Sequence, residues 1–167
     1  MRPEIRQAAD SDVVELQRYA TSLFSENLPG IFRRPPPTLD EEYEFVRSRI
    51  EPSNSTLLVA VLGGRIVGLL DLAGGTLAEE SHVGTFGLSI DRGHRGHSIG
   101  TALIEALVSW APEHGISRIQ AWAWANNPQA VALYERLGFV QEGLCKRAII
   151  SDGEPVDVKL LALLLVA

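Results

Sequence analysis

Cysteine is almost absent from the sequence, and so are long apolar runs. The single cysteine, Cys145, cannot form a disulfide within the chain, and no cysteine cluster exists to hold zinc. The longest apolar run, residues 160–167, has eight residues, whereas roughly 20 are needed to cross a bilayer. The first residues, Met1–Glu4, lack the apolar core of a secretory signal. We therefore expect a cytoplasmic protein with no membrane segment and no metal centre.

An excess of basic residues is missing too. The chain has 15 Lys and Arg against 21 Asp and Glu, a net charge of −6, whereas proteins that bind nucleic acid present a basic surface. We therefore expect no nucleic-acid partner. One short segment, residues 91–97, departs from this balance, because it contains Arg92, His94, Arg95 and His97 with a single acid. A small cationic patch on an acidic protein favours a compact anionic ligand.

The rest of the composition is that of a soluble globular domain. The 167 residues are 46% apolar and 22% charged, which excludes wholesale disorder. A chain of this length buries enough surface to fold without a metal or a disulfide. We predict one domain spanning residues 1–167.

Hydrophobic periodicity alternates between helix-like and strand-like segments. Two β-rich runs, 56–62 and 65–72, are joined by Gly63 and Gly64, a strong two-residue hairpin signal. The other predicted elements are helices at 13–24, after Thr38, at 100–114 and from Asn127-Pro128 onward, and strands at 83–90, 118–124, 144–150 and 156–166. This order predicts an α/β (α+β) fold with a mixed, mostly antiparallel, twisted sheet and about four helices.

A glycine-rich basic loop joins a strand to a helix within residues 88–101. Small residues let backbone N–H groups converge there, and the start of a helix adds partial positive charge, so phosphate is the natural ligand. The loop lacks both the Gly-Lys-Ser/Thr of a Walker loop and the G-x-G-x-x-G spacing of a dinucleotide fold. Its shape alone leaves two interpretations, a phosphate site or a plain connection.

Two motifs carry a resemblance to the GNAT N-acetyltransferases. Arg95-Gly96-His97-Ser98-Ile99-Gly100-Thr101 resembles the R/Q-x-x-G-x-G/A loop whose amides hold the pyrophosphate of CoA in that family. Asn127-x-x-Ala130-x-x-Leu133-Tyr134-x-x-x-Gly138-Phe139 resembles the family pattern N-x-x-A-x-x-L-Y-x-x-x-G-F. Ser98 stands where the loop pattern has its first glycine, which keeps the amide donor but adds strain if that position needs a positive φ.

The resemblance implies the GNAT fold, acetyl-CoA as the donor, and a set of residues that contact it. Those residues are Leu88, Ser89, Ile90, Arg95, Gly96, His97, Ser98, Ile99, Gly100, Thr101, Asn127 and Tyr134.

Acetyl transfer from a thioester to an amine requires a polarised carbonyl, a proton for the departing thiolate, and a way to remove a proton from the amine. The resemblance gives the thiolate proton to Tyr134, whose ordinary pKa near 10 suits a general acid. The backbone N–H of Leu88 is the expected partner of the carbonyl oxygen.

The identity of the general base, the group that removes a proton from the amine, remains open. Some family members carry a glutamate five residues before the asparagine of the second motif, and this sequence has Trp122 there. Glu79, Glu80, His82 and a water chain are the remaining candidates. The alternation of Trp122 and Trp124 with two alanines places both rings on one face, where they either pack under a helix, which we predict, or stack on substrate.

Segments 81–87, 142–143 and 152–157 resemble GNAT members that acetylate amino acids or other small amines. We therefore expect an acetyl-CoA-dependent N-acetyltransferase acting on a primary amine of a small molecule, with Arg33-Arg34 either on a plain surface loop or at the border of the acceptor site. Two alternatives stay open: a protein N-terminal or lysine acetyltransferase, and a non-catalytic acyl-CoA-binding module. A homodimer is also left open.

Overall fold

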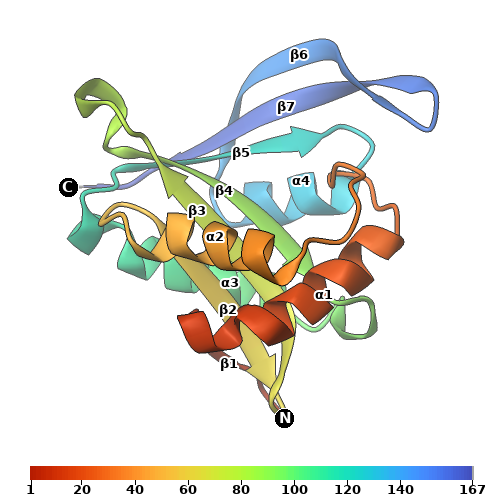
Figure 1. Cartoon of the computed structure of the whole chain (residues 1–167). Helices are drawn as coiled ribbons and strands as arrows, with labels where there is room; N and C mark the ends of the chain where they lie inside the picture. Colours follow the sequence, from red (N-terminus) through yellow and green to blue (C-terminus); the bar gives the residue numbers. More distant parts are fainter. Residues whose placement is uncertain (167) are drawn as a thin grey trace.

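One seven-stranded sheet runs through the molecule (Figure 1). The computed structural model describes residues 1–166. The strands are β1 (Glu4–Gln7), β2 (Thr56–Leu62), β3 (Arg65–Gly74), β4 (Val83–Ile90), β5 (Arg118–Trp124), β6 (Val140–Ser151) and β7 (Glu154–Leu164). Their order in the sheet is β1-β2-β3-β4-β5-β7-β6, and every neighbouring pair is antiparallel except β4 and β5. The predicted α/β (α+β) fold with a mostly antiparallel sheet is confirmed.

Four helices flank this sheet. They are α1 (Val13–Ser25), α2 (Leu39–Ile50), α3 (Ile99–Trp110) and α4 (Pro128–Arg136), with short 3-10 turns at Asp10–Asp12, Ala78–Glu80, Arg92–His94 and Pro112–His114. The helix predicted at 100–114 stops being α-helical at Trp110, because Pro112 has no N–H to continue the ladder. Gly115, at φ 74°, then ends the segment.

Local sequence explains where α2 begins. The Thr38 hydroxyl accepts a hydrogen bond from the backbone N–H of Glu41 at 3.2 Å, and the Glu41 carboxylate accepts one from the Thr38 N–H at 2.8 Å. This reciprocal pair satisfies two donors at the helix start. The hairpin between β2 and β3 also forms as predicted, because Gly63 and Gly64 both take positive φ.

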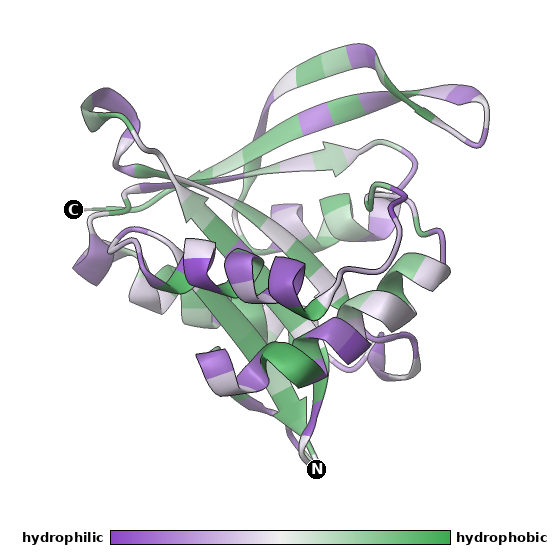
Figure 2. Ribbon diagram, in the orientation of Figure 1, coloured by the Kyte–Doolittle hydropathy of each residue, from purple (hydrophilic) through white to green (hydrophobic). Residues whose placement is uncertain are grey.

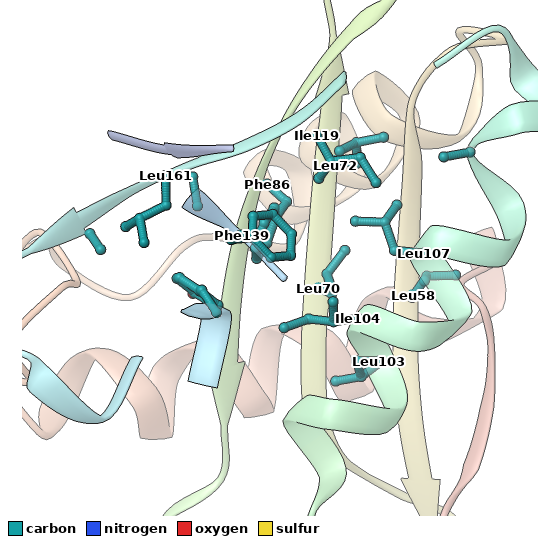
Figure 3. Packing of buried hydrophobic residues seen from close by; sticks show 14 of the residues in the cluster. Leu58, Leu70, Leu72, Phe86, Leu103, Ile104, Leu107, Ile119, Phe139 and Leu161 are labelled. Atoms are coloured by element: carbon teal, nitrogen blue, oxygen red, sulfur yellow. The ribbon is translucent and has the colours of Figure 1, made fainter. Parts of the chain in front are cut away.

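The helices divide into two layers (Figure 1). Helices α1 and α2 cover one face of the sheet, and α3 and α4 cover the other. Hydrophobic residues concentrate in the central strands, while the outer side of α2 is hydrophilic (Figure 2). The larger core lies between α3 and the sheet, where side chains of α3 pack against those of β2, β3 and β4 (Figure 3). Its labelled members are Leu58, Leu70, Leu72, Phe86, Leu103, Ile104, Leu107, Ile119, Phe139 and Leu161.

The parallel pair β4 and β5 is joined over a short stretch only. Three residues of each strand pair, from Val83 with Arg118 to Thr85 with Gln120. Beyond Thr85, β4 continues beside β3 as far as Ile90, while β5 continues beside β7 as far as Trp124. The strands therefore separate toward their carboxyl ends, and this separation creates the gap in which the candidate site lies.

No helix among the described residues is both long and apolar enough to cross a bilayer.

Candidate active site

A cavity of about 820 Å³ occupies the gap between β4 and β5. Its walls come from the end of β4, the start of α3, α4, the end of β5, and the chain that follows α1. Of the twelve residues expected to contact acetyl-CoA, only His97 does not line it. The structure therefore brings together most of a set that spans residues 88–134 in the sequence.

The first turn of α3 presents free amide donors to this cavity. The first intrahelical bond runs from the N–H of Ala102 to the carbonyl of Ser98, at 3.1 Å. The preceding N–H groups, those of Ile99, Gly100 and Thr101, have no partner within the helix. Together with the helix dipole, they give an arrangement that suits the predicted contact with phosphate.

Ser98 has the left-handed backbone conformation that its place in the loop pattern suggested. Its φ is 61° and its ψ is 16°, and its side chain does not cap α3. In this region of backbone conformation a serine is sterically more strained than a glycine. The turn nevertheless leaves the helix start open, with no hydroxyl covering the free amides.

Gly100 is required for packing as well as for access. A Cβ at this position would lie 3.2 Å from Leu133 Cδ2 and 3.3 Å from Leu88 Cδ2, tighter than ordinary contact. The lack of a side chain therefore lets α3 approach both β4 and α4 closely.

Side chains of the loop brace it instead of pointing at a ligand. Arg95 pairs with Glu26, at the end of α1, at 2.9 Å, and its Nε donates to the carbonyl of Ile90 at 3.0 Å. His94 bonds to Asp91 at 2.9 Å. These contacts hold the basic loop beside α1 and leave its backbone to face the cavity.

The N–H of Leu88 points into the gap. Along β4, the N–H of Asp91 donates to Val67 of β3, and the carbonyl of Val83 accepts from Gly75, both at 2.9 Å. In an antiparallel ladder alternate residues face the same neighbour, so the odd-numbered residues of β4 bond to β3 and Leu88 faces the other way. Pairing with β5 has ended by then. This orientation suits the predicted contact with a carbonyl oxygen.

Tyr134 lies in the wall formed by α4. Its side chain is 6% exposed, and its ring meets that of Phe86 edge-on with centroids 5.2 Å apart. Burial raises the pKa of its hydroxyl to about 12. The side chain therefore stays protonated at neutral pH, as a general acid must.

Asn127 and Ser89 are both engaged by other parts of the protein. The Asn127 side chain accepts from the N–H of Ala130 and donates to the carbonyl of Pro29, each at 3.4 Å, so it caps α4 and holds the chain after α1. The Ser89 hydroxyl lies 3.0 Å from the hydroxyl of Tyr19 in α1.

Glu80 and His82 lie at the opposite end of β4 from Leu88. His82 lies six positions before Leu88 along extended chain, a span of about 20 Å. Neither residue lines the cavity, nor does Glu79. The structure does not bring these base candidates together with Tyr134.

The tryptophans of β5 show that the predicted packing under a helix is wrong. Ala121 and Ala123 take that place, in the core against α3 and α4. Trp122 is 49% exposed on the other face, and Trp124 packs against Phe32 with ring centroids 5.1 Å apart. The alternation correctly predicted that both tryptophans share one face of β5, but it could not show that α3 and α4 cover the opposite face.

Charged side chains gather on the same face as the tryptophans. Arg49 of α2 pairs with Asp71 of β3 at 3.2 Å. Burial raises the pKa of both Asp71 and Glu42, and the positive charge of Arg34 opposes this rise at both carboxyls. Arg33 pairs with Asp152 in the turn between β6 and β7. The chain between α1 and α2 therefore borders the gap.

Asp71 was missed by the sequence reasoning. It stands directly opposite Gly87 in the ladder between β3 and β4. The only available signal was the glycine inside a strand, which indicates a place where something approaches the backbone closely.

Several known proteins are similar to this chain. Over 106 residues it is 28% identical to the L-amino acid N-acetyltransferase AaaT of Escherichia coli (strain K12), covering 63% of this chain and 65% of that protein. It is 34% identical over 94 residues to N-acetylaspartate synthetase of Mus musculus, covering 56% of this chain and 31% of that protein. The match thus spans less than two-thirds of the length of either relative.

Solved structures match along nearly the whole chain. An acetyltransferase of the GNAT family from Streptococcus pneumoniae superposes with a TM-score of 0.89 at 26% identity, over 98% of this chain and 99% of that one. A GNAT superfamily phosphinothricin acetyltransferase from Sinorhizobium meliloti, in complex with AcCoA, gives a TM-score of 0.86 at 21% identity, over 99% and 89%. The sequence profile described as "Acetyltransferase (GNAT) family" matches residues 18–139, and with that match over most of its length the chain belongs to the GNAT acetyltransferase family.

Proposed function

We propose that the protein transfers an acetyl group from acetyl-CoA to a primary amine of a small molecule such as an amino acid. One observation carries the proposal. The free amides of α3, the N–H of Leu88 and the buried Tyr134 line a single cavity in the gap between β4 and β5. One acetyl-CoA molecule in this cavity can therefore contact all three: the amides that would bind its phosphates, the N–H that would polarise its carbonyl, and the hydroxyl that would protonate its sulfur.

Direct attack by the amine accounts for the available groups. The nitrogen forms a bond to the acetyl carbon while the N–H of Leu88 stabilises the negative charge on the carbonyl oxygen. The carbon–sulfur bond then breaks, and Tyr134 gives its proton to the thiolate. The proton that the nitrogen loses as the amide forms restores the tyrosine hydroxyl, so the products are a neutral amide and free CoA thiol. An acyl-cysteine route lacks support, because Cys145 is exposed on β6 and does not line the cavity.

Acetyl-CoA is favoured as the donor by the geometry at α3 and by the acetyl-CoA bound in the phosphinothricin acetyltransferase of similar fold. A small acceptor is favoured by the ion pair between Arg33 and Asp152, which joins the chain after α1 to the turn between β6 and β7 and narrows the approach for a polypeptide. The relative from Escherichia coli acts on L-amino acids by its name.

The decisive experiment follows the release of free CoA thiol from acetyl-CoA with a panel of amino acids, other small amines and short peptides. We expect thiol release with at least one small amine. Release only with peptides would favour the protein acetyltransferase, and tight acetyl-CoA binding with no release would favour a binding module. Failure to bind acetyl-CoA in calorimetry would overturn the assignment of the cavity.

A further inference from the structure

We propose that Asp71 is the catalytic base, taking the proton from the ammonium group of the acceptor before the amine attacks. The inference rests on the proposed function and supplies the proton acceptor that it lacks. Asp71, like Glu79, Glu80 and His82, is not among the residues that line the cavity. Unlike them, it stands directly opposite Gly87, which lines the cavity and precedes the residue that carries the carbonyl-binding amide.

The position of Asp71 is set by strand register. Asp71 of β3 pairs with Gly87 of β4, the residue immediately before Leu88. A Cβ built on Gly87 would lie 2.9 Å from Asp71 Oδ1. The carboxylate therefore lies over the bare backbone of Gly87, one residue from the N–H that faces the gap.

Gly87 leaves this place open to a ligand. It is exposed, although it lies in the middle of a strand whose other residues are at least partly buried. Any larger residue would fill the space over the strand and press on Asp71. An exposed glycine facing a carboxylate gives the small ammonium group of an acceptor room to reach Asp71 and the thioester together.

Burial and two arginines act on the pKa of Asp71 in opposite directions. Arg49 of α2 donates to Oδ2 at 3.2 Å, and Arg34 adds positive charge from the chain before α2. Glu42, seven residues before Arg49 in α2, is the other carboxyl group that is close enough to be influenced by Arg34. Burial raises the pKa of Asp71 against the pull of both arginines, which brings the carboxylate closer to the proton affinity that a base needs at neutral pH.

If the pair of Arg49 and Asp71 only supported the structure, the activity of the variants would depend on pH in a different way. A brace between α2 and β3 would act through Arg49, and its loss would weaken activity equally at every pH. The Asp71 side chain is 27% exposed, more than a fully enclosed brace requires. The pH dependence of the variants therefore separates the two roles.

The test uses Asp71→Asn with an amine that the parent protein acetylates. We expect kcat/KM for the amine to fall at least about 100-fold at pH 7, and the deficit to shrink as the pH rises and the amine loses its proton unaided. KM for acetyl-CoA should change less than about threefold. Asp10→Asn is the matched control, because Asp10 pairs with Arg47 of α2 at 3.1 Å and does not line the cavity.

Two further variants keep the test decisive if Asp71→Asn folds poorly. Gly87→Ala retains the ion pair but displaces the carboxylate, so it should reproduce the pH-dependent deficit. Arg49→Gln should cost less than Asp71→Asn at pH 7. A deficit in Asp71→Asn that is independent of pH and equalled by Arg49→Gln would overturn the inference, as would activity near that of the parent. A parent that acetylates no amine would instead overturn the proposed function, and the inference with it.

Discussion

Tyr134 is the side chain whose chemistry depends most on its surroundings. Its ring packs against those of Phe86 and Phe139, and burial is the cause of the raised pKa of its hydroxyl. Tyr134→Phe removes the hydroxyl with little change in volume, so we expect kcat to fall roughly 10²- to 10⁴-fold while affinity for acetyl-CoA stays similar. Because the pKa is about 12, the deficit should be constant from pH 7 to about pH 10, as steady-state rates will show.

The controls for Tyr134 are the two residues at the far end of β4. Glu80→Gln and His82→Ala should each leave kcat within about threefold of the parent, because neither lines the cavity. Turnover near the parent's in Tyr134→Phe, together with loss of activity in Glu80→Gln, would reverse these roles.

Ser98 offers a direct test of the phosphate site. Gly100→Val is a poor test, because its side chain would also strain the contacts to Leu88 and Leu133. Asparagine and aspartate both tolerate the left-handed region, so Ser98→Asp and Ser98→Asn differ mainly in charge. We expect the aspartate to weaken acetyl-CoA binding about tenfold or more, or at least about 1.4 kcal/mol, and the asparagine to change it much less.

Calorimetry with acetyl-CoA measures both variants, and Ser98→Gly should bind as well as the parent or slightly better. Equal affinity in the aspartate and asparagine variants would place the pyrophosphate elsewhere.

At the scale of elements, Asn127 joins α4 to the chain that follows α1. Asn127→Ala loses both the cap on Ala130 and the donor to Pro29, and we expect it to lower the free energy of unfolding by about 1 kcal/mol. Asn127→Asp keeps the capping oxygen and loses only the donor, so most of that stability should remain. Urea unfolding distinguishes them, and equal losses would mean that the bond to Pro29 matters more than the cap.

Strands and helix starts are the elements that the sequence predicts best. The strands predicted at 83–90 and 118–124, the second from its alternation, are β4 and β5 with the bounds observed, and Asn127-Pro128 predicted where α4 begins. Each of these signals is local: a side-chain period of two, or a cap followed by a proline with no N–H to lose.

Other features depend on contacts between segments that are distant in the sequence, and the sequence pattern did not predict them. Gly87 lies over Asp71 because β3 and β4 adopt one register, and no periodicity reports that register. Trp122 faces away from α3 and α4 because these helices cover the other side of β5, which depends on the whole chain path. The roles of Tyr134 and Leu88 came from a resemblance and remain predictions.

At the scale of the whole molecule, buried tyrosines couple stability to alkaline pH. The pKa of Tyr134 rises from about 10 in the unfolded chain to about 12 in the fold, and burial also raises that of Tyr19. A raised folded-state pKa gives stability that is complete below about pH 10 and is lost as the pH rises toward the folded value. Urea unfolding should therefore show a free energy of unfolding that falls between about pH 10 and pH 12, less steeply in Tyr134→Phe. An identical slope in that variant would contradict the buried state of the hydroxyl.

The oligomeric state depends on the surfaces that the whole molecule exposes. Strand β6 is the edge of the sheet, and Val140, Leu144 and Ile150 on it are exposed. The single domain of residues 1–167 stays a prediction, which limited proteolysis can test, and light scattering can decide between a monomer and the homodimer left open by the sequence.

The separation of β4 from β5 leaves candidate site residues on both faces of the sheet. The α3 amides lie on one side of the sheet, while Asp71 and Trp122 lie on the other, so the donor and the acceptor need not share a path. Neither molecule then has to leave before the other arrives, and neither blocks the departure of the other. The kinetic signature is a ternary complex with no compulsory order, seen as intersecting lines in double-reciprocal plots of initial rate. Parallel lines would instead indicate that the acetyl group rests on the protein between two half-reactions.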